Sequence, residues 1–134
     1  IEAFKAESLP PVNVKIYPPT VDVCKYYQNA SLLLNLSKTD QWIETFGLTI
    51  IEAMAYGVPC ICPPVGGPAE IVKDGETGFL LNSENVDEIA RMILDLSENN
   101  SVMTNLSQNC TVAVNQFSSQ NFAASIKAVL SFTA

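Results

Sequence analysis

Short apolar runs that alternate with helical patterns are the feature that most limits how this chain can fold. Compact apolar runs at residues 32–36, 59–62 and 79–81 have the composition of strands covered on both faces of a sheet. Apolar spacing and helix-terminal residues predict helices over residues 47–55, from Pro68 through Val72, and over residues 86–94. Because parallel strands need such crossovers, the pattern predicts an α/β fold, a Rossmann-like parallel sheet with flanking helices. We expect one domain over residues 1–134, with residues 1–11 as a lead-in.

The segments around this pattern carry weaker signals. Residues 12–17 alternate apolar and polar side chains, which predicts a half-buried strand, and residues 21–29 predict a short helix. Asn85 and Glu88 resemble a capping box at the start of the 86–94 helix. Two further helical segments, near residues 102–113 and 122–130, are expected to pack over the sheet.

The composition excludes several classes of function. A net charge of −7 and the lack of a basic stripe argue against nucleic-acid binding. The chain has no histidine, which removes Ser-His-Asp and Cys-His catalysis and most zinc sites. No apolar run is long enough to span a membrane.

The four cysteines are expected to be reduced, buried thiols rather than a disulfide framework. Cys60 and Cys62 lie in an apolar strand pattern and are too close together for a CxxC metal pair. Cys24 and Cys110 fall on apolar helical faces. Reduced thiols favour a cytoplasmic protein.

Two glutamates, Glu44 and Glu52, frame the start of the 47–55 helix, with seven residues between them. The loops after the 32–36 and 59–62 strands should open on the same edge of the sheet, where parallel α/β folds bind ligands. The first helical amides, at Gly47, Leu48 and Thr49, would point outward with the positive end of the helix dipole behind them, which favours a phosphate. Gly47 has no Cβ, so a diphosphate can approach its backbone closely.

The two carboxylates would then have different tasks. Side chains in a helix tilt toward its N-terminus, so Glu52 would reach back to accept two hydroxyls of a ribose. Glu44, outside the helix, would face what lies beyond the phosphates. The alternative is that Glu52 is a solvated helix residue and Glu44 an ordinary acid at a helix start.

A series of short motifs in one order resembles the donor half of retaining GT-B glycosyltransferases of family 4, also described as group 1. The likeness is specific over residues 32–81 and extends loosely from Val12 to about Phe132, which implies an incomplete C-terminal lobe that binds a nucleotide-sugar. The matching stretches are Glu44-x7-Glu52, Phe46-Gly47-Leu48, Glu52-Ala53-Met54-Ala55-x-Gly57-x-Pro59, Gly66-Gly67-Pro68-Ala69-Glu70-Ile71-Val72 and Asp74-Gly75-x-Thr77-Gly78-Phe79-Leu80.

The resemblance implies roles for individual residues. Glu52 would bind the ribose of a nucleotide-sugar, and Glu44 would be the catalytic residue that contacts hydroxyls of the donor sugar. The sugar would be transferred with retention and without a metal or cofactor, and Glu44 would orient and stabilise rather than attack, unlike a glycosidase nucleophile. The remaining donor-binding positions would be Phe46, Gly47, Leu48, Thr49, Gly66 and Gly67.

The resemblance also implies partners outside this chain. A glycan or lipid-linked acceptor would bind an N-terminal lobe that the fragment lacks. The fragment alone is then expected to be inactive, because catalysis needs both lobes and a cationic clamp on the diphosphate. The full-length protein would act in polysaccharide or glycoconjugate synthesis, in the cytoplasm or peripherally at the inner face of the membrane. The 12–17 strand would need a neighbour, which self-association could supply.

Two alternatives and one difference from the family stay open. The competing hypothesis is a non-catalytic module that binds a nucleotide or nucleotide-sugar on the same scaffold. A GT-B-like sugar epimerase is disfavoured by the missing histidine and by the Gly-Gly-x-x-Glu stretch.

The family places a serine closer to its first glutamate than Ser37 lies to Glu44, so a longer loop is expected here. In that loop Trp42 would either touch donor or acceptor or anchor the loop by packing.

Overall fold

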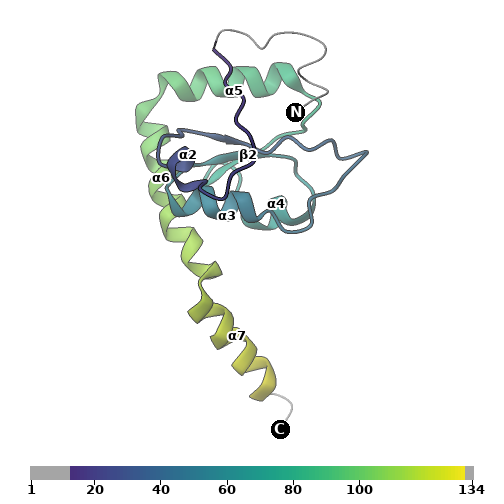
Figure 1. Cartoon of the computed structure of the whole chain (residues 1–134), viewed down its shortest axis with the longest axis vertical. Helices are drawn as coiled ribbons and strands as arrows, with labels where there is room; N and C mark the ends of the chain where they lie inside the picture. The colour runs from purple at the N-terminus through teal and green to yellow at the C-terminus, as the bar shows by residue number, and fades with distance from the viewer. Residues whose placement is uncertain (1–12, 132–134) are drawn as a thin grey trace.

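The computed structural model describes residues 13–131, which form a small parallel sheet with helices on both faces (Figure 1). In this part of the chain the sheet has three strands, β1 (Leu33–Leu34), β2 (Cys60–Cys62) and β3 (Gly78–Leu80), in the order β1-β2-β3. Both neighbouring pairs are parallel, with Leu33 opposite Cys60 and Cys60 opposite Gly78. The predicted α/β fold with a parallel sheet is therefore confirmed.

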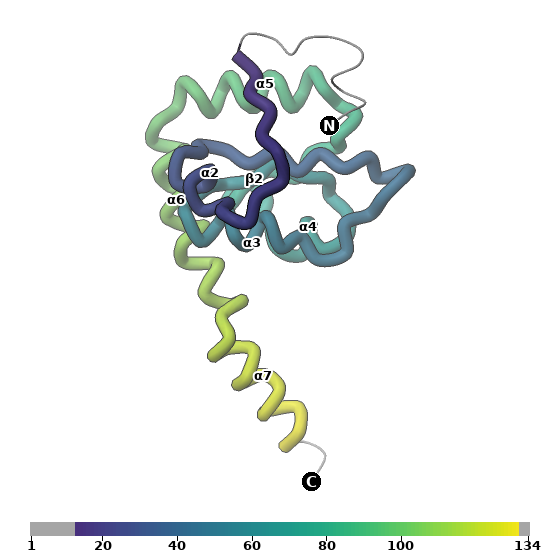
Figure 2. Tube along the Cα trace, in the orientation of Figure 1, coloured from purple at the N-terminus to yellow at the C-terminus, as the bar shows by residue number. Residues whose placement is uncertain are grey.

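The helices form a layer on each side of this sheet. Figures 1 and 2 show α5 (Val86–Glu98) across one face, and α3 (Leu48–Ala55) and α4 (Gly66–Ile71) against the other. α6 (Asn100–Ala113) follows α5 and packs against α3. A 3-10 turn, η1 (Val114–Phe117), then leads into α7 (Ser119–Ser131). None of the helices within residues 13–131 is long and apolar enough to cross a membrane.

The core is centred on β2, whose three residues are fully buried. Because side chains alternate along a strand, Cys60 and Cys62 share one face of the sheet, where they join Ile50 and Met54 of α3. Burying an aliphatic side chain of this size stabilises the fold by roughly 1.5–3 kcal/mol. The apolar face of α3 therefore fixes the helix on the sheet and leaves its N-terminus to be placed by the preceding loop.

The end of α3 confirms the stop predicted at Gly57. This glycine has a φ of 71°, in the left-handed region. Its N–H donates to Met54 O at 2.9 Å, and the next amide, of Val58, donates to Ala53 O at 3.0 Å. This pair of bonds is a Schellman motif, which satisfies the last helical carbonyls and turns the chain into β2.

The strand predicted at residues 12–17 is wrong for the residues that are described. Residue 12 lies outside them, and residues 13–17 are exposed and form no ladder. Alternation alone cannot make a strand without a neighbour to complete its hydrogen bonds. Tyr17 instead packs its ring on Tyr26, with centroids 4.8 Å apart. Self-association stays a prediction, but an unpaired strand at residues 12–17 no longer supports it.

The next two predicted elements are shorter or more exposed in the structure than expected. The helix expected over residues 21–29 is only α2 (Cys24–Tyr27). The 32–36 run forms the two-residue β1, and Leu34 and Leu36 are 44% and 37% exposed rather than covered. β1 is an edge of the described sheet, so the helices cover it incompletely.

α7 does not pack over the sheet as predicted. It projects from the body of the molecule in Figures 1 and 2, and none of its residues is buried. The extended backbone of Ser118, with φ −65° and ψ 150°, redirects the chain after η1. The apolar spacing of Phe122 and Ile126 correctly indicated an amphipathic helix but not its placement.

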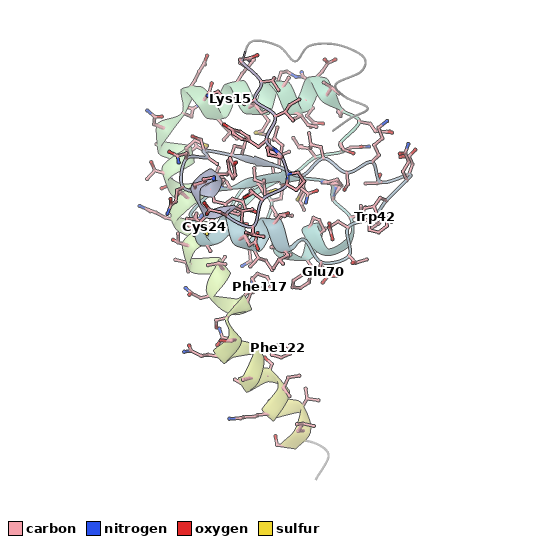
Figure 3. The ribbon with its side chains drawn as sticks, viewed as in Figure 1. Lys15, Cys24, Trp42, Glu70, Phe117 and Phe122 are labelled. Atoms are coloured by element: carbon pink, nitrogen blue, oxygen red, sulfur yellow. The ribbon has the colours of Figure 1, made fainter. Side chains whose placement is uncertain are left out.

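The predictions about the four cysteines were partly correct. Cys60, Cys62 and Cys110 are buried free thiols, as expected, whereas Cys24 on the short surface helix α2 is exposed (Figure 3). Burial raises the pKa of Cys110 to about 11.

The capping box predicted at the start of α5 is wrong. Asn85 Nδ2 donates to Glu88 Oε2 at 2.6 Å, but neither side chain bonds a helical backbone amide. The two side chains bond each other instead, because an amide and a carboxylate three residues apart are within reach on the first turn of a helix.

Candidate functional site

The N-terminus of α3 lies at the carboxyl edge of the sheet, as predicted, because the chain returns from β1 to the helix at that edge. Gly47 is the N-cap residue, with a φ of 83°. A Cβ on Gly47 would lie 3.3 Å from Ile50 Cδ1 and 3.4 Å from Ile71 Cδ1. The left-handed backbone and the close side chains together favour glycine at this position.

The first two helical residues, Leu48 and Thr49, are exposed. Their amides have no earlier helical turn to bond to, and they lie at the positive end of the helix dipole. The hydrogen bonds to the Gly47 carbonyl come from later amides, those of Ile50 at 3.0 Å and Ile51 at 3.4 Å. The geometry is that of a helix N-terminus able to receive an anion.

The carboxylate of Glu44 folds over the start of α3 from outside. Its Oε1 accepts the N–H of Phe46 at 3.3 Å and the N–H of Gly47 at 3.4 Å. The Gly47 amide, predicted to be free for a phosphate, is therefore already bonded. The prediction was wrong on this amide because it depends on the conformation of the Glu44 side chain, which spacing does not determine. Leu48 and Thr49 remain as candidates for an anion.

The Gly66–Gly67 pair lies directly against the Glu44 segment, so the two predicted loops do open on one edge. The Gly67 N–H donates to Glu44 O at 2.9 Å. A Cβ on Gly67 would lie 2.6 Å from the carbonyl oxygens of Thr45 and Phe46, which leaves no room for one. The structure corrects one detail, because Gly66 and Gly67 form the first turn of α4 rather than a loop.

Glu52 lies one turn inside α3 and has a partner that the sequence analysis missed. Its Oε2 accepts a hydrogen bond from the phenol of Tyr27 at 3.0 Å, in a partly buried setting. The ring of Tyr27 stacks on Tyr56, with centroids 5.8 Å apart and planes 22° from parallel. Glu52 is therefore not a freely solvated helix residue. The only available signal was the presence of Tyr27 within the predicted 21–29 helix.

The environment of Tyr27 keeps its phenol protonated. Burial first, and then the hydrogen bond and charge of Glu52, raise the pKa of Tyr27 to about 12. At neutral pH the phenol is consequently a donor, and the carboxylate of Glu52 is the acceptor. The two carboxylates of the candidate site are thus fixed separately, Glu44 by backbone amides and Glu52 by a phenol.

Exposed apolar side chains border the start of α3. Phe46 is 56% exposed and Leu48 57% exposed. Trp42 is 66% exposed and lies at the outer edge of the molecule (Figure 3). Trp42 is therefore not a packed anchor of its loop, and a contact with donor or acceptor stays a prediction.

Hollows in the described chain lie at the opposite edge of the sheet. One of about 370 Å³ is lined by Leu32 and Met103 among others, and one of about 550 Å³ by Tyr56 and Gly57. Neither includes Glu44 or Glu52. We favour the helix N-terminus over these hollows, because it alone combines a helix dipole with two oriented carboxylates.

One of the sequence motifs serves the fold rather than the site. In the turn before β3, Thr77 Oγ1 accepts the Lys73 N–H at 2.9 Å, and Asp74 Oδ1 accepts the Leu80 N–H at 2.9 Å. Thr77 is buried, and its carbonyl also accepts the thiol of Cys110 at 3.2 Å. The Asp-Gly-x-Thr-Gly pattern thus builds the entry to β3.

Within residues 13–131 no group of three Cys, Asp or Glu side chains is placed to hold a metal ion. The expectation that the reaction needs neither metal nor cofactor stays a prediction.

Comparison with known proteins agrees with this geometry. The sequence model of the family Glycosyl transferases group 1 matches residues 3–113. The chain belongs to this family. This group 1 chain is 30% identical over 109 residues to N-acetyl-alpha-D-glucosaminyl L-malate synthase of Bacillus anthracis, covering 81% of the chain and 28% of that relative. It is 50% identical over 52 residues to sucrose synthase of Denitrovibrio acetiphilus, covering 39% of the chain and 7% of that relative.

Solved structures give the same assignment. Anabaena HepE in complex with UDP superimposes with a TM-score of 0.74 at 26% identity, over 84% of this group 1 chain and 30% of HepE. The predicted resemblance to GT-B glycosyltransferases is therefore confirmed. The alignments cover less than a third of the length of these relatives.

Proposed function

We propose that this chain binds the donor of a retaining glycosyltransferase, a sugar linked to a nucleoside diphosphate. The observation that carries the proposal is the pair of oriented carboxylates at the start of α3, with Glu44 bonded to backbone amides and Glu52 to Tyr27. The HepE structures support this class of ligand, since one holds UDP and another holds UDP-glucose.

The diphosphate binds at the N-terminus of α3. The amides of Leu48 and Thr49 donate to its oxygens, and the helix dipole supplies a partial positive charge of about half a unit. The chain carries a net charge of −7, so this local dipole, rather than the overall field, attracts the anion. Phe46, Gly66 and Gly67 border the sugar and the diphosphate.

Glu52 binds the ribose. Tyr27 occupies one site on Oε2, so the other oxygen and the remaining lone pairs can accept the two ribose hydroxyls. Glu44 faces the donor sugar from the other side of the phosphates. This order along α3 matches the order of a nucleotide-sugar, which runs from ribose through diphosphate to sugar.

In the transfer, the bond between the anomeric carbon and the diphosphate oxygen breaks, and a bond to the acceptor oxygen forms on the same face. The acceptor proton passes to the departing diphosphate. Glu44 contacts sugar hydroxyls and stabilises the positive charge that develops on the ring, without forming a bond to it. The dipole of α3 stabilises the negative charge on the leaving group.

We propose that a glycan or lipid-linked acceptor, and the cations that complete the diphosphate site, contact groups outside residues 13–131. The reaction uses neither metal nor cofactor. A cytoplasmic location is part of this proposal, because the buried free thiols suit a reducing compartment.

The test is a titration of the full-length protein with UDP, ADP and GDP and their glucose esters, followed by turnover. Glu52→Ala should weaken binding of the preferred diphosphate about tenfold or more, because hydrogen bonds to a charged acceptor contribute roughly 1.5–3 kcal/mol each. Glu44→Gln should reduce turnover far more than it reduces diphosphate affinity. Glu98→Gln, an exposed charge change at the end of α5, is the control and should alter neither.

Unchanged diphosphate affinity in Glu52→Ala would show that the ribose assignment is wrong. Unchanged turnover in Glu44→Gln would remove Glu44 from the reaction. Binding of a nucleotide-sugar by the parent protein with no transfer to any acceptor would favour the non-catalytic binding module instead.

A further inference from the structure

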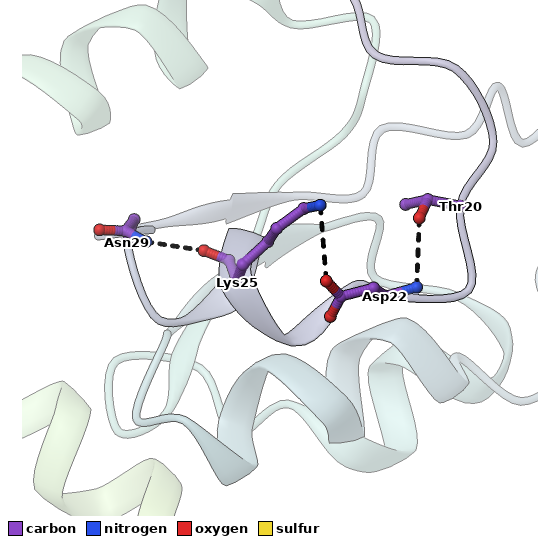
Figure 4. A network of polar contacts seen from close by, with 4 residues as sticks. All are labelled: Thr20, Asp22, Lys25 and Asn29. Atoms are coloured by element: carbon purple, nitrogen blue, oxygen red, sulfur yellow. Dashed lines mark hydrogen bonds and ion pairs between the residues drawn. The ribbon is translucent and has the colours of Figure 1, made fainter.

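The segment that carries Tyr27 is held by its own polar network (Figure 4). The Asp22 N–H donates to Thr20 Oγ1 at 3.2 Å, and Lys25 Nζ lies 3.5 Å from Asp22 Oδ2. Asn29 Nδ2 donates to Lys25 O at 2.7 Å. These contacts link residues on both sides of Tyr27, although the segment lies at the surface and α2 is only four residues long.

The side chain of Tyr27 is aligned with α3 at two points. Its ring stacks on Tyr56, and its hydroxyl reaches Glu52, one helical turn before Tyr56. Residues four apart share a face of a helix, so ring and hydroxyl contact the same face. The stacked ring thus fixes the phenol oxygen beside Glu52 Oε2, so the hydroxyl keeps this acceptor within reach.

A glutamate on a helix normally samples several rotamers, and a ligand must then restrict the side chain when it binds. Within residues 13–131 the only ion pair is Lys25–Asp22, so Glu52 has no salt bridge there that would hold it. The phenol supplies a fixed donor instead. Because burial and the Glu52 contact raise the pKa of Tyr27 to about 12, this donor persists across physiological pH.

We propose that Tyr27 is a positioning residue for the nucleotide, which holds the Glu52 carboxylate in the orientation that accepts the ribose hydroxyls. This inference rests on the proposed function, because it assumes that Glu52 binds ribose. Tyr27 itself need not touch the ligand. Its effect should appear only where the ribose hydroxyls are present.

The experiment measures binding of UDP and of its dideoxyribose analogue, which lacks both ribose hydroxyls, to the full-length protein. The variants are Tyr27→Phe, Glu52→Gln and the double variant. Tyr27→Phe keeps the stacked ring and removes only the hydroxyl. Tyr26→Phe is the matched control, because it removes a hydroxyl from the adjacent residue of α2, whose ring packs on Tyr17 instead.

We expect Tyr27→Phe to weaken UDP binding about fivefold, the effect of one net hydrogen bond, and to leave the analogue unchanged. In the Glu52→Gln background the same change should add no further loss, and Tyr26→Phe should have no effect. Equal weakening of UDP and the analogue would overturn the proposal, because a merely structural role moves both. No weakening of either would overturn it as well.

The proposed function fails in a different way. If the parent does not prefer UDP to the analogue, or if Glu52→Gln binds UDP as well as the parent, the ribose assignment is wrong and this inference falls with it. If Glu52→Gln loses the preference but Tyr27→Phe keeps it, only the role of Tyr27 is overturned. Should Tyr27→Phe not fold, Tyr27→Leu is measured for the same ratio of affinities.

Discussion

The contact between Gly66 and the Glu44 segment can be isolated by comparing two glycines that have the same backbone conformation. Gly66 has a φ of 68° and Gly75 a φ of 72°. An added Cβ at Gly75 meets no atom within 4 Å. At Gly66 it would overlap the carbonyl oxygen of Glu44 and lie 2.8 Å from Ile43 Cγ2. Gly66→Ala and Gly75→Ala therefore share the conformational cost and differ only in the clash.

The magnitudes separate the two variants. A left-handed backbone costs an L residue about 1–2 kcal/mol, which is the whole expected loss of unfolding free energy in Gly75→Ala. In Gly66→Ala, overpacking against the neighbouring backbone adds about 1–3 kcal/mol. Because the clash is with the Glu44 carbonyl, relieving it separates the start of α4 from the segment that carries the Glu44 carboxylate. Gly66→Ala should thus lose turnover as well as stability.

Urea unfolding of both variants gives the difference in free energy, and donor turnover by the full-length protein gives the effect on the site. Gly66→Ala should be less stable than Gly75→Ala by about 1–3 kcal/mol, and only Gly66→Ala should lose activity. Equal losses of stability in the two variants would refute the reasoning, since the Glu44 segment would then move aside without cost. Full activity in Gly66→Ala would show that the Glu44 carboxylate does not depend on this contact.

Three further predictions concern the fold and its titrating groups. Thr77→Val leaves the Lys73 amide without its acceptor and should lower the free energy of unfolding in urea by about 1–3 kcal/mol. The control Thr104→Val, at an exposed hydroxyl, should lower it by less than about 0.5 kcal/mol, and equal losses in the two variants would contradict the role of Thr77. Of the four cysteines, Cys24 alone should react quickly with a disulfide reagent in the native protein, and fast reaction of a second thiol would contradict the burial of the other three. The pKa of Tyr27 is raised on folding from 10.0 to about 12, so its contribution to stability is complete below pH 10 and is lost as the pH rises toward about 12. Urea unfolding across that range should show this loss in the parent and a weaker pH dependence in Tyr27→Phe.

The sheet and α3 were predictable because their signals are local. Compact apolar runs identify the three strands, though not how fully each is buried, and Gly57 identifies a helix end, without reference to the rest of the chain. The joint position of Glu44 and Gly67 was predictable for a related reason. Loops that follow parallel strands meet at one edge of the sheet, so their meeting follows from topology alone.

The remaining features depend on contacts between distant segments or on side-chain conformation. Tyr27 and Glu52 are 25 residues apart, and no spacing rule connects a short surface helix to the middle of α3. Apolar residues recur at regular spacing in residues 13–17 and in α7. Such spacing does not show which surface, if any, covers those side chains. The use of the Gly47 amide by Glu44 is set by a rotamer, which no sequence pattern encodes.

The segment before Glu44 is attached at its two ends. Ser37 O accepts the hydroxyl of Ser83 at 2.8 Å, and Glu44 O accepts the amide of Gly67 at 2.9 Å. Between these attachments the chain can lengthen at little thermodynamic cost, about 0.6 kcal/mol for each doubling of a flexible loop. Evolution could therefore insert, delete or exchange residues around Trp42 while the Glu44 carboxylate keeps its position. Differences in length and sequence among related chains should therefore be concentrated in this stretch rather than in α3.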